Sequence, residues 1–108
     1  MEKDADITQL LAWLRQRLGN GFVVADHWNI DLRATGLSAT NDPSQLVYVS
    51  GLGPDRYFLE LESAPLPGSN VPYRVLDRYD SVSRDELLDI VCHHLRVVRL
   101  PYLHETSK

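Results

Sequence analysis

The chain has 108 residues, of which 44% are hydrophobic and 24% are charged, and 11 Lys and Arg against 15 Asp and Glu give a formal net charge of −4. This length and apolar content predict one globular α+β domain over residues 1–108 and argue against a disordered or fibrous chain. The acidic balance disfavours a nucleic-acid partner, and the single cysteine excludes an intramolecular disulfide.

The first predicted element is a helix from about Ile7 to Leu18. Asp6 and Gln9 have the spacing of a capping box, and Gly19 supplies a left-handed stop. Its apolar residues fall within one arc of the helix that should face the core: Ile7, Leu10, Leu11, Leu14 and Leu18. Trp13 lies outside this arc, where it either covers the edge of the core or anchors a partner.

Five segments with β-like composition follow the first helix. The second of them alternates strictly and puts Asp31 and Arg33 on the face opposite Leu32. The loops between the segments are Asn41–Ser44, a connection of hairpin length at Gly51–Asp55, and a breaker-rich stretch at Ser63–Pro72. The predicted strands are Phe22–Ala25, Ile30–Leu37, Leu46–Ser50, Tyr57–Glu62 and Tyr73–Tyr79.

A second helix is predicted from Arg84 to about Leu95. Ser83 and Glu86 have the spacing of a capping box, and Val82 and Leu87 that of a hydrophobic staple. Apolar residues cover roughly half of its circumference, so we expect this helix to be more deeply buried than the first. A short tail, at about residues 102–108, follows Pro101.

The order helix, strands, helix contains no connection long enough for a crossover between parallel strands. We therefore expect an antiparallel sheet of four to five strands in α-β-β-β-β-α order. Both helices should pack on one face of the sheet, which leaves the other face to water or to a partner. Which face of the last strand points inward stays open.

Few residues have the chemistry of a catalytic or metal site. Cys92, His93 and His94 diverge by about 100° per residue on a helix and cannot converge on one ion, so we expect no metal and no cofactor. His94 projects into the apolar arc, either as a hydrogen-bonded core histidine or as a base in a pocket between helix and sheet. Glu60 and Glu62 share one strand face, which is typical of solvated side chains.

The remaining candidates belong to a recognition surface. Charged side chains on the open sheet face, with Tyr48, Phe58 and Tyr73 nearby, have the composition of an interface, although a solvated sheet with cross-strand ion pairs is the alternative. The candidate partner-binding residues are Trp13, Asp31, Arg33, Phe58, Glu60, Glu62 and Arg74.

The strands Leu46–Ser50 and Tyr57–Glu62, followed by the helix Ser83–Val91, resemble small acidic bacterial α+β proteins. Some proteins of that build act as immunity proteins that neutralise polymorphic toxins. We therefore expect a small protein-binding module, of the immunity type, whose partner is a basic toxin domain. The alternatives are a ligand-binding or enzymatic domain with a pocket near His94, and a homodimer through the open sheet face.

Two further expectations concern location. The acidic start, Met1–Asp6, lacks the basic and apolar pattern of a secretory signal. No stretch approaches the roughly 18 consecutive apolar residues of a membrane span. We therefore expect a cytoplasmic protein with no membrane partner.

Overall fold

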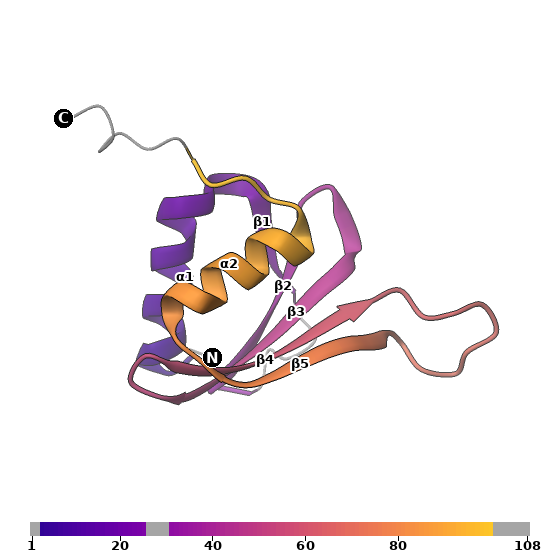
Figure 1. Cartoon of the computed structure of the whole chain (residues 1–108), viewed down its shortest axis with the longest axis horizontal. Coiled ribbons are helices and arrows are strands. Elements are labelled where there is room, and N and C mark those ends of the chain that lie inside the picture. The colour runs from indigo at the N-terminus through magenta and orange to yellow at the C-terminus, as the bar shows by residue number, and fades with distance from the viewer. Residues whose placement is uncertain (1–2, 26–30, 101–108) are drawn as a thin grey trace.

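The computed structural model describes residues 3–25 and 31–100 of the chain (Figure 1). The tail predicted for residues 102–108 and Ile30 of the predicted second strand lie outside these residues. The five strands form one antiparallel sheet in the order β1-β2-β3-β4-β5, which confirms the predicted α+β class. The elements are α1 (Ala5–Leu18), a 3-10 turn (Gly19–Gly21), β1 (Phe22–Ala25), β2 (Ala34–Ala39), β3 (Asp42–Gly53), β4 (Arg56–Ser63), β5 (Arg74–Val82) and α2 (Arg84–Leu95).

Both helices cover the same face of the sheet, as predicted (Figure 1). Leucines of α1 and of α2 belong to one buried cluster together with inward residues of the central strands. Burial of these apolar side chains is the main driving force for docking the helices on the sheet. The side chains most fully enclosed in this core include Leu14, Leu37, Val47, Val49, Leu59, Leu87 and Val91.

The two helices start in different ways. α2 has the predicted capping box, in which Ser83 Oγ accepts from Glu86 N at 3.2 Å and Glu86 Oε1 accepts from Ser83 N at 2.8 Å. The capping box predicted for Asp6 and Gln9 is wrong, because α1 begins at Ala5 with Asp4 at its N-cap. The Asp4 N–H donates to the Leu32 carbonyl at 2.8 Å. The start of α1 is therefore fixed by a hydrogen bond to a residue that is distant in sequence.

Two predicted strand starts are also wrong. β2 begins at Ala34, because Asp31 accepts from Arg33 N at 3.0 Å through its side chain and so forms a turn. β3 begins at Asp42, four residues before the predicted start, and this strand includes most of the loop predicted for residues 41–44. Pairing of Ala39 with Asp42 leaves only two residues for the connection between β2 and β3.

The hairpin of β4 and β5 extends beyond the helices as an arm (Figure 1). We define the arm as the connection 64–73 together with the strand ends that flank it. It contributes to a longest dimension of 53 Å against 27 and 25 Å for the other two. Leu66, Val71 and Val75 are about half exposed on it. Further along β5, Tyr79 packs against the core, and Arg78 pairs with Glu60 on the opposite face. This arrangement settles which face of that part of the strand points inward.

We call the sheet face turned away from the helices the outer face. Its residues follow from the register, which pairs Tyr48 with Glu60, Ser50 with Phe58 and Glu60 with Arg78. The expectation of an open outer face holds only in part, because all six residues of β2 are buried. Partly exposed side chains of this face therefore lie over β3, β4 and β5, and Val23 of β1 is exposed at the other edge of the sheet.

Candidate functional site

Alternation along β4 produces the main group of polar and aromatic side chains on the outer face. Leu59 and Leu61 point into the core, so Phe58, Glu60 and Glu62 point outward. Neighbouring elements contribute further side chains to the same area. We call the whole set the outer-face cluster, consisting of Tyr48 from β3, Phe58, Glu60 and Glu62 from β4, Tyr73 directly before β5, and Arg78 from β5.

Within this cluster, Glu60 has a cation as its partner and Tyr48 has an aromatic one. Glu60 Oε2 accepts from Arg78 Nη2 at 2.9 Å and from Arg78 Nε at 3.2 Å. The rings of Tyr48 and Phe58 meet edge to face, with their centroids 6.1 Å apart. Both contacts cross between strands, so they fix these side chains relative to one another.

Glu62 differs from its neighbour, because its side chain is 1% exposed. Its Oε1 atom has no hydrogen-bond partner among the residues that the structure describes. Burial raises the pKa of the Glu62 carboxyl to about 8, and a hydrogen bond to Glu60 and the charge of Glu60 act in the same direction. The expectation that Glu62 would be a solvated carboxylate is therefore wrong, while Glu60 is half-buried.

Two phenols lie within electrostatic range of this carboxyl. Burial raises the pKa of Tyr73, and the charges of Glu62 and Glu60 raise it further. Burial also raises the pKa of Tyr48; a hydrogen bond to Ser50 opposes the shift, and the charge of Asp31 adds to it. Both tyrosines therefore remain neutral donors and acceptors at physiological pH, and Asp31 lies close to the cluster.

The other predicted partner-binding residues lie apart from this cluster. Arg33 is 3.9 Å from Asp4, beside the start of α1. Arg74 is exposed at the base of the arm, opposite Ser63. The structure thus brings together four of the seven predicted candidates: Asp31, Phe58, Glu60 and Glu62.

Trp13 lies on the helical side, where its ring packs against the core. The guanidinium groups of Arg17 and Arg84 lie 4.1 and 4.4 Å from the centroid of this ring. These cations of the same chain occupy the position that a partner's cation would need. This geometry fits the prediction that Trp13 covers the edge of the core.

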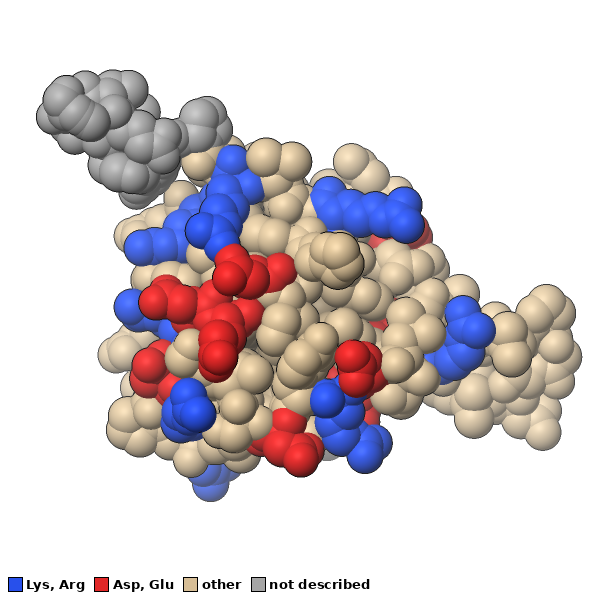
Figure 2. Space-filling model, in the orientation of Figure 1, with Lys and Arg blue, Asp and Glu red and all other residues tan. Residues whose placement is uncertain are grey.

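Acidic side chains also gather over the N-terminal end of α2 (Figure 2). Asp85 and Glu86 occupy the first turn of this helix, and Glu86 completes the capping box. Negative charge there stabilises the helix by interaction with its dipole. This acidic group therefore has a structural explanation, whereas the buried carboxyl of Glu62 has none.

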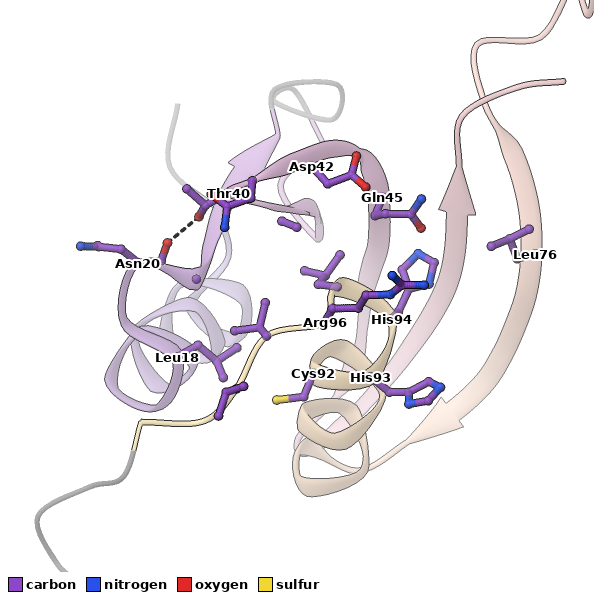
Figure 3. Close-up of a pocket in the computed structure, with 16 residues that line it drawn as sticks. Leu18, Asn20, Thr40, Asp42, Gln45, Leu76, Cys92, His93, His94 and Arg96 are labelled. Atoms are coloured by element: carbon purple, nitrogen blue, oxygen red, sulfur yellow. Dashed lines mark hydrogen bonds between the residues drawn. The ribbon is translucent and has the colours of Figure 1, made fainter. Parts of the chain in front are cut away.

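A second candidate site is a cleft of about 1180 Å³ at the C-terminal end of α2 (Figure 3). His94 and Arg96 line it from the helix, Asp42 and Gln45 from β3, and Leu76 from β5. His94 lies 2.9 Å from the Glu62 carbonyl through Nε2. Because a carbonyl only accepts, Nε2 carries a hydrogen and donates it to this carbonyl. His94 is thus half-buried and hydrogen-bonded, and it also lines a cleft.

The backbone of Arg96 adds a second feature to this cleft. Arg96 ends α2 in the left-handed conformation, with φ 58° and ψ 47°, a position that usually favours glycine. A hydrogen bond from Ser44 is the main cause that lowers the pKa of Asp42, and the charge of Arg96 contributes. The lining of the cleft therefore includes a cation, Arg96, and an anion, Asp42, as well as His94.

Metal and thiol chemistry find little support in the described part of the chain. Residues 3–25 and 31–100 contain no group of three or more His, Cys, Asp or Glu side chains able to hold a metal ion. Burial raises the pKa of the Cys92 thiol, although Arg99 opposes the shift. Cys92 is therefore a thiol at physiological pH and lacks the activation of a nucleophile.

Several site residues were not among the sequence candidates. Tyr48 and Tyr73 were noted near the predicted sheet, and Arg78 was not singled out. The signal that could have selected all three is the register between strands. The sequence contains a turn pattern at Asp42 and Ser44 but no other signal for the cleft residues Asp42, Gln45 and Arg96. The cleft forms only because of where α2 ends relative to β3.

Comparison of this chain with protein-family models, curated proteins and solved structures found no match. Of the described residues, no helical stretch has the length and apolar character needed to cross a bilayer.

Proposed function

We propose that this chain is a protein-binding module that docks a basic protein partner on the outer-face cluster, as an immunity-type inhibitor of a toxin would. The observation that carries the proposal is the Glu62 carboxyl, which is 1% exposed and has an oxygen without a hydrogen-bond donor in the described structure. A buried acceptor left unsatisfied costs about 1–3 kcal/mol. A partner that supplies the missing donor would recover that free energy.

The surroundings of Glu62 support the same proposal. Tyr48, Phe58 and Arg78 are of the residue types enriched at protein interfaces. The net charge of −4 favours approach of a basic partner by electrostatic steering. These features also suit a binding protein better than an enzyme, because the outer-face cluster contains no nucleophile paired with a base.

The test is affinity capture from the source cells with the wild-type chain and with Phe58→Ala, which removes an aromatic anchor. We expect one partner at physiological salt and a loss of affinity of about thirtyfold or more for Phe58→Ala, the usual effect of a hot-spot residue. Trp13→Phe is the matched aromatic control on the helical side and should bind like the wild type. Equal capture by wild type and Phe58→Ala would contradict the proposal.

A second candidate function is small-ligand binding or catalysis in the cleft near His94. The specific observation in its favour is the ring of His94, which is fixed through Nε2 and lines the cleft together with Arg96. His94→Gln distinguishes the two candidates, since it should leave partner capture intact and abolish a function located in the cleft. Light scattering of the purified chain first establishes whether it forms a homodimer.

A further inference from the structure

We propose that Glu62 receives one cationic side chain of the partner, an arginine or a lysine, and that this cation displaces the proton of Glu62 as it docks. The inference rests on the proposed function of the same face and specifies its chemistry. On binding, the Glu62 carboxylic acid becomes a carboxylate paired with the incoming cation, and the proton is released to water.

Glu62 has one hydrogen-bonded carboxyl neighbour, Glu60, and one carboxyl oxygen without a partner in the described structure. Its Oε1 atom is buried without a partner in the described part of the chain. Arg78 directs both Nε and Nη2 to Glu60 rather than to Glu62. His94 binds the backbone carbonyl of Glu62 and not its carboxyl group. Among the described residues, no ion pair therefore neutralises Glu62 from within the chain.

The groups that face Glu62 keep it protonated when no partner is bound. Glu60 on β4 places a second carboxyl beside it, and two neighbouring negative charges in a buried position repel each other. Tyr48 on β3 and Tyr73 before β5 are neutral phenols. Arg78 on β5 is engaged by Glu60, and Asp31 adds negative charge near Tyr48. A positive charge at Oε1 would reverse this balance and ionise Glu62.

Aromatic rings favour an organic cation over a metal ion at this position. Tyr48, Phe58 and Tyr73 offer π-electron surfaces, to which the cationic group of an arginine or lysine is attracted. The same chain stacks its own guanidinium groups on rings, with Arg15 4.0 Å from the centroid of Phe22. A metal ion would need further oxygen ligands, and the described residues do not group three carboxylates here.

The experiment uses the full chain labelled with 13C at the glutamate carboxyl carbons and follows Glu62 by NMR from pH 5 to pH 10. The probe is n-butylguanidinium, which imitates an arginine side chain, and n-butylurea is its neutral counterpart. We expect the free protein to titrate near pH 8 at Glu62. n-Butylguanidinium should lower that midpoint and bind about tenfold more tightly at pH 9 than at pH 7, whereas n-butylurea should leave the midpoint unchanged.

Two outcomes would overturn the inference: a Glu62 midpoint that n-butylguanidinium does not move, or probe affinity that is the same at pH 7 and pH 9. Glu62→Gln keeps the shape of the side chain and should remove the pH dependence of probe binding. If that variant does not fold, the wild-type titration alone decides the question.

The same measurements separate this inference from the proposed function. If capture of the partner depends on Phe58 while the probe leaves Glu62 unchanged, the binding face stands and the proton release is wrong. If the probe moves the Glu62 midpoint while Phe58→Ala captures the partner normally, the cation site stands and the proposed docking face is wrong.

Discussion

The helical side around Trp13 and the outer face around Glu62 have similar compositions. They differ in whether the chain itself supplies interaction partners for the central side chain. Both combine aromatic rings with arginines on regular elements. Around Trp13 the chain supplies its own cations, since Arg17 and Arg84 stack on the ring and Arg17 also donates to the Trp13 carbonyl at 3.3 Å. On the outer face, Arg78 satisfies Glu60, but Glu62 keeps an oxygen without a donor in the described structure.

Under the proposed function, this difference favours the outer face over the helical side as the place where a partner docks. A cation arriving at Trp13 would have to displace a guanidinium that is already in place, so the net gain is small. A cation arriving at Glu62 would satisfy a buried acceptor and gain a charge-assisted hydrogen bond, which is stronger than a neutral one. The two regions have similar residue types. They are distinguished by the buried Glu62 oxygen that lacks a hydrogen-bond partner in the described structure.

The largest expected effect is the loss of stability with rising pH that Glu62 causes. Folding raises the pKa of Glu62 from 4.5 to about 8, so the folded chain holds this proton more tightly than the unfolded chain. The resulting stabilisation is full below pH 4.5 and is lost as the pH rises through 8. It amounts to about 3 kcal/mol between pH 5 and pH 8.

Urea denaturation of the wild type and Glu62→Gln at both pH values measures this contribution as the difference between the two proteins. The wild type should lose the additional stability, and Glu62→Gln should not. Parallel pH profiles for the two proteins would show that Glu62 is not the group responsible.

The next effect in size belongs to the helical side. Trp13→Ala removes a half-buried ring that packs against the core, together with the surface on which two guanidinium groups stack. We expect a loss of about 2 kcal/mol in the free energy of unfolding, below the 3–5 kcal/mol of a fully buried tryptophan. Partner affinity per folded molecule should stay at the wild-type level. A loss of affinity without a loss of stability would make Trp13 a docking residue.

Local signals predicted the parts of the fold whose contacts are close in sequence. The α2 capping box was predicted because Ser83 and Glu86 are three residues apart and need no other element. The start of α1 was missed because it depends on the hydrogen bond from Asp4 to Leu32. The alternation through Asp31 suggested a strand, but the carboxylate of that residue forms a turn instead.

The candidate site shows the same limit. Alternation along β4 was sufficient to place Phe58, Glu60 and Glu62 on one face, as the structure has them. It could not predict which of the two glutamates is buried, because the pattern is the same for both. Their difference arises across strands, where Arg78 lies opposite Glu60 and Val75 lies opposite Glu62.

A double-mutant cycle on Glu60 and Arg78 would measure a smaller effect. The pair is joined by two hydrogen bonds to one carboxylate oxygen, but the Arg78 side chain is 58% exposed. Solvent screening limits such a pair to about 1 kcal/mol of coupling. The cycle compares the unfolding free energies of Glu60→Gln, Arg78→Gln and the double variant at low and high salt. Coupling that does not fall with salt would contradict an exposed ion pair.

Glu60→Gln also tests the link between the two glutamates. Removing the neighbouring charge should lower the pKa of Glu62, because that charge is one of the causes that raise it. The Glu62 midpoint in the carboxyl NMR titration measures this directly. An unchanged midpoint would mean that burial alone keeps Glu62 protonated.

The smallest effect is expected from Arg84→Met. This change keeps most of the apolar stem and removes the guanidinium that lies 4.4 Å from the Trp13 ring centroid. An exposed cation–π contact contributes about 0.5–1 kcal/mol, and Arg17 still covers the ring at 4.1 Å, so the loss should lie at the low end. Repeating the change in Trp13→Ala is the control, since Arg84→Met should then cost nothing. An equal loss of stability in the wild-type and Trp13→Ala backgrounds would mean that Arg84 acts through the first turn of α2. In that case only Arg17 would contribute a stabilising cation–π contact with the Trp13 ring.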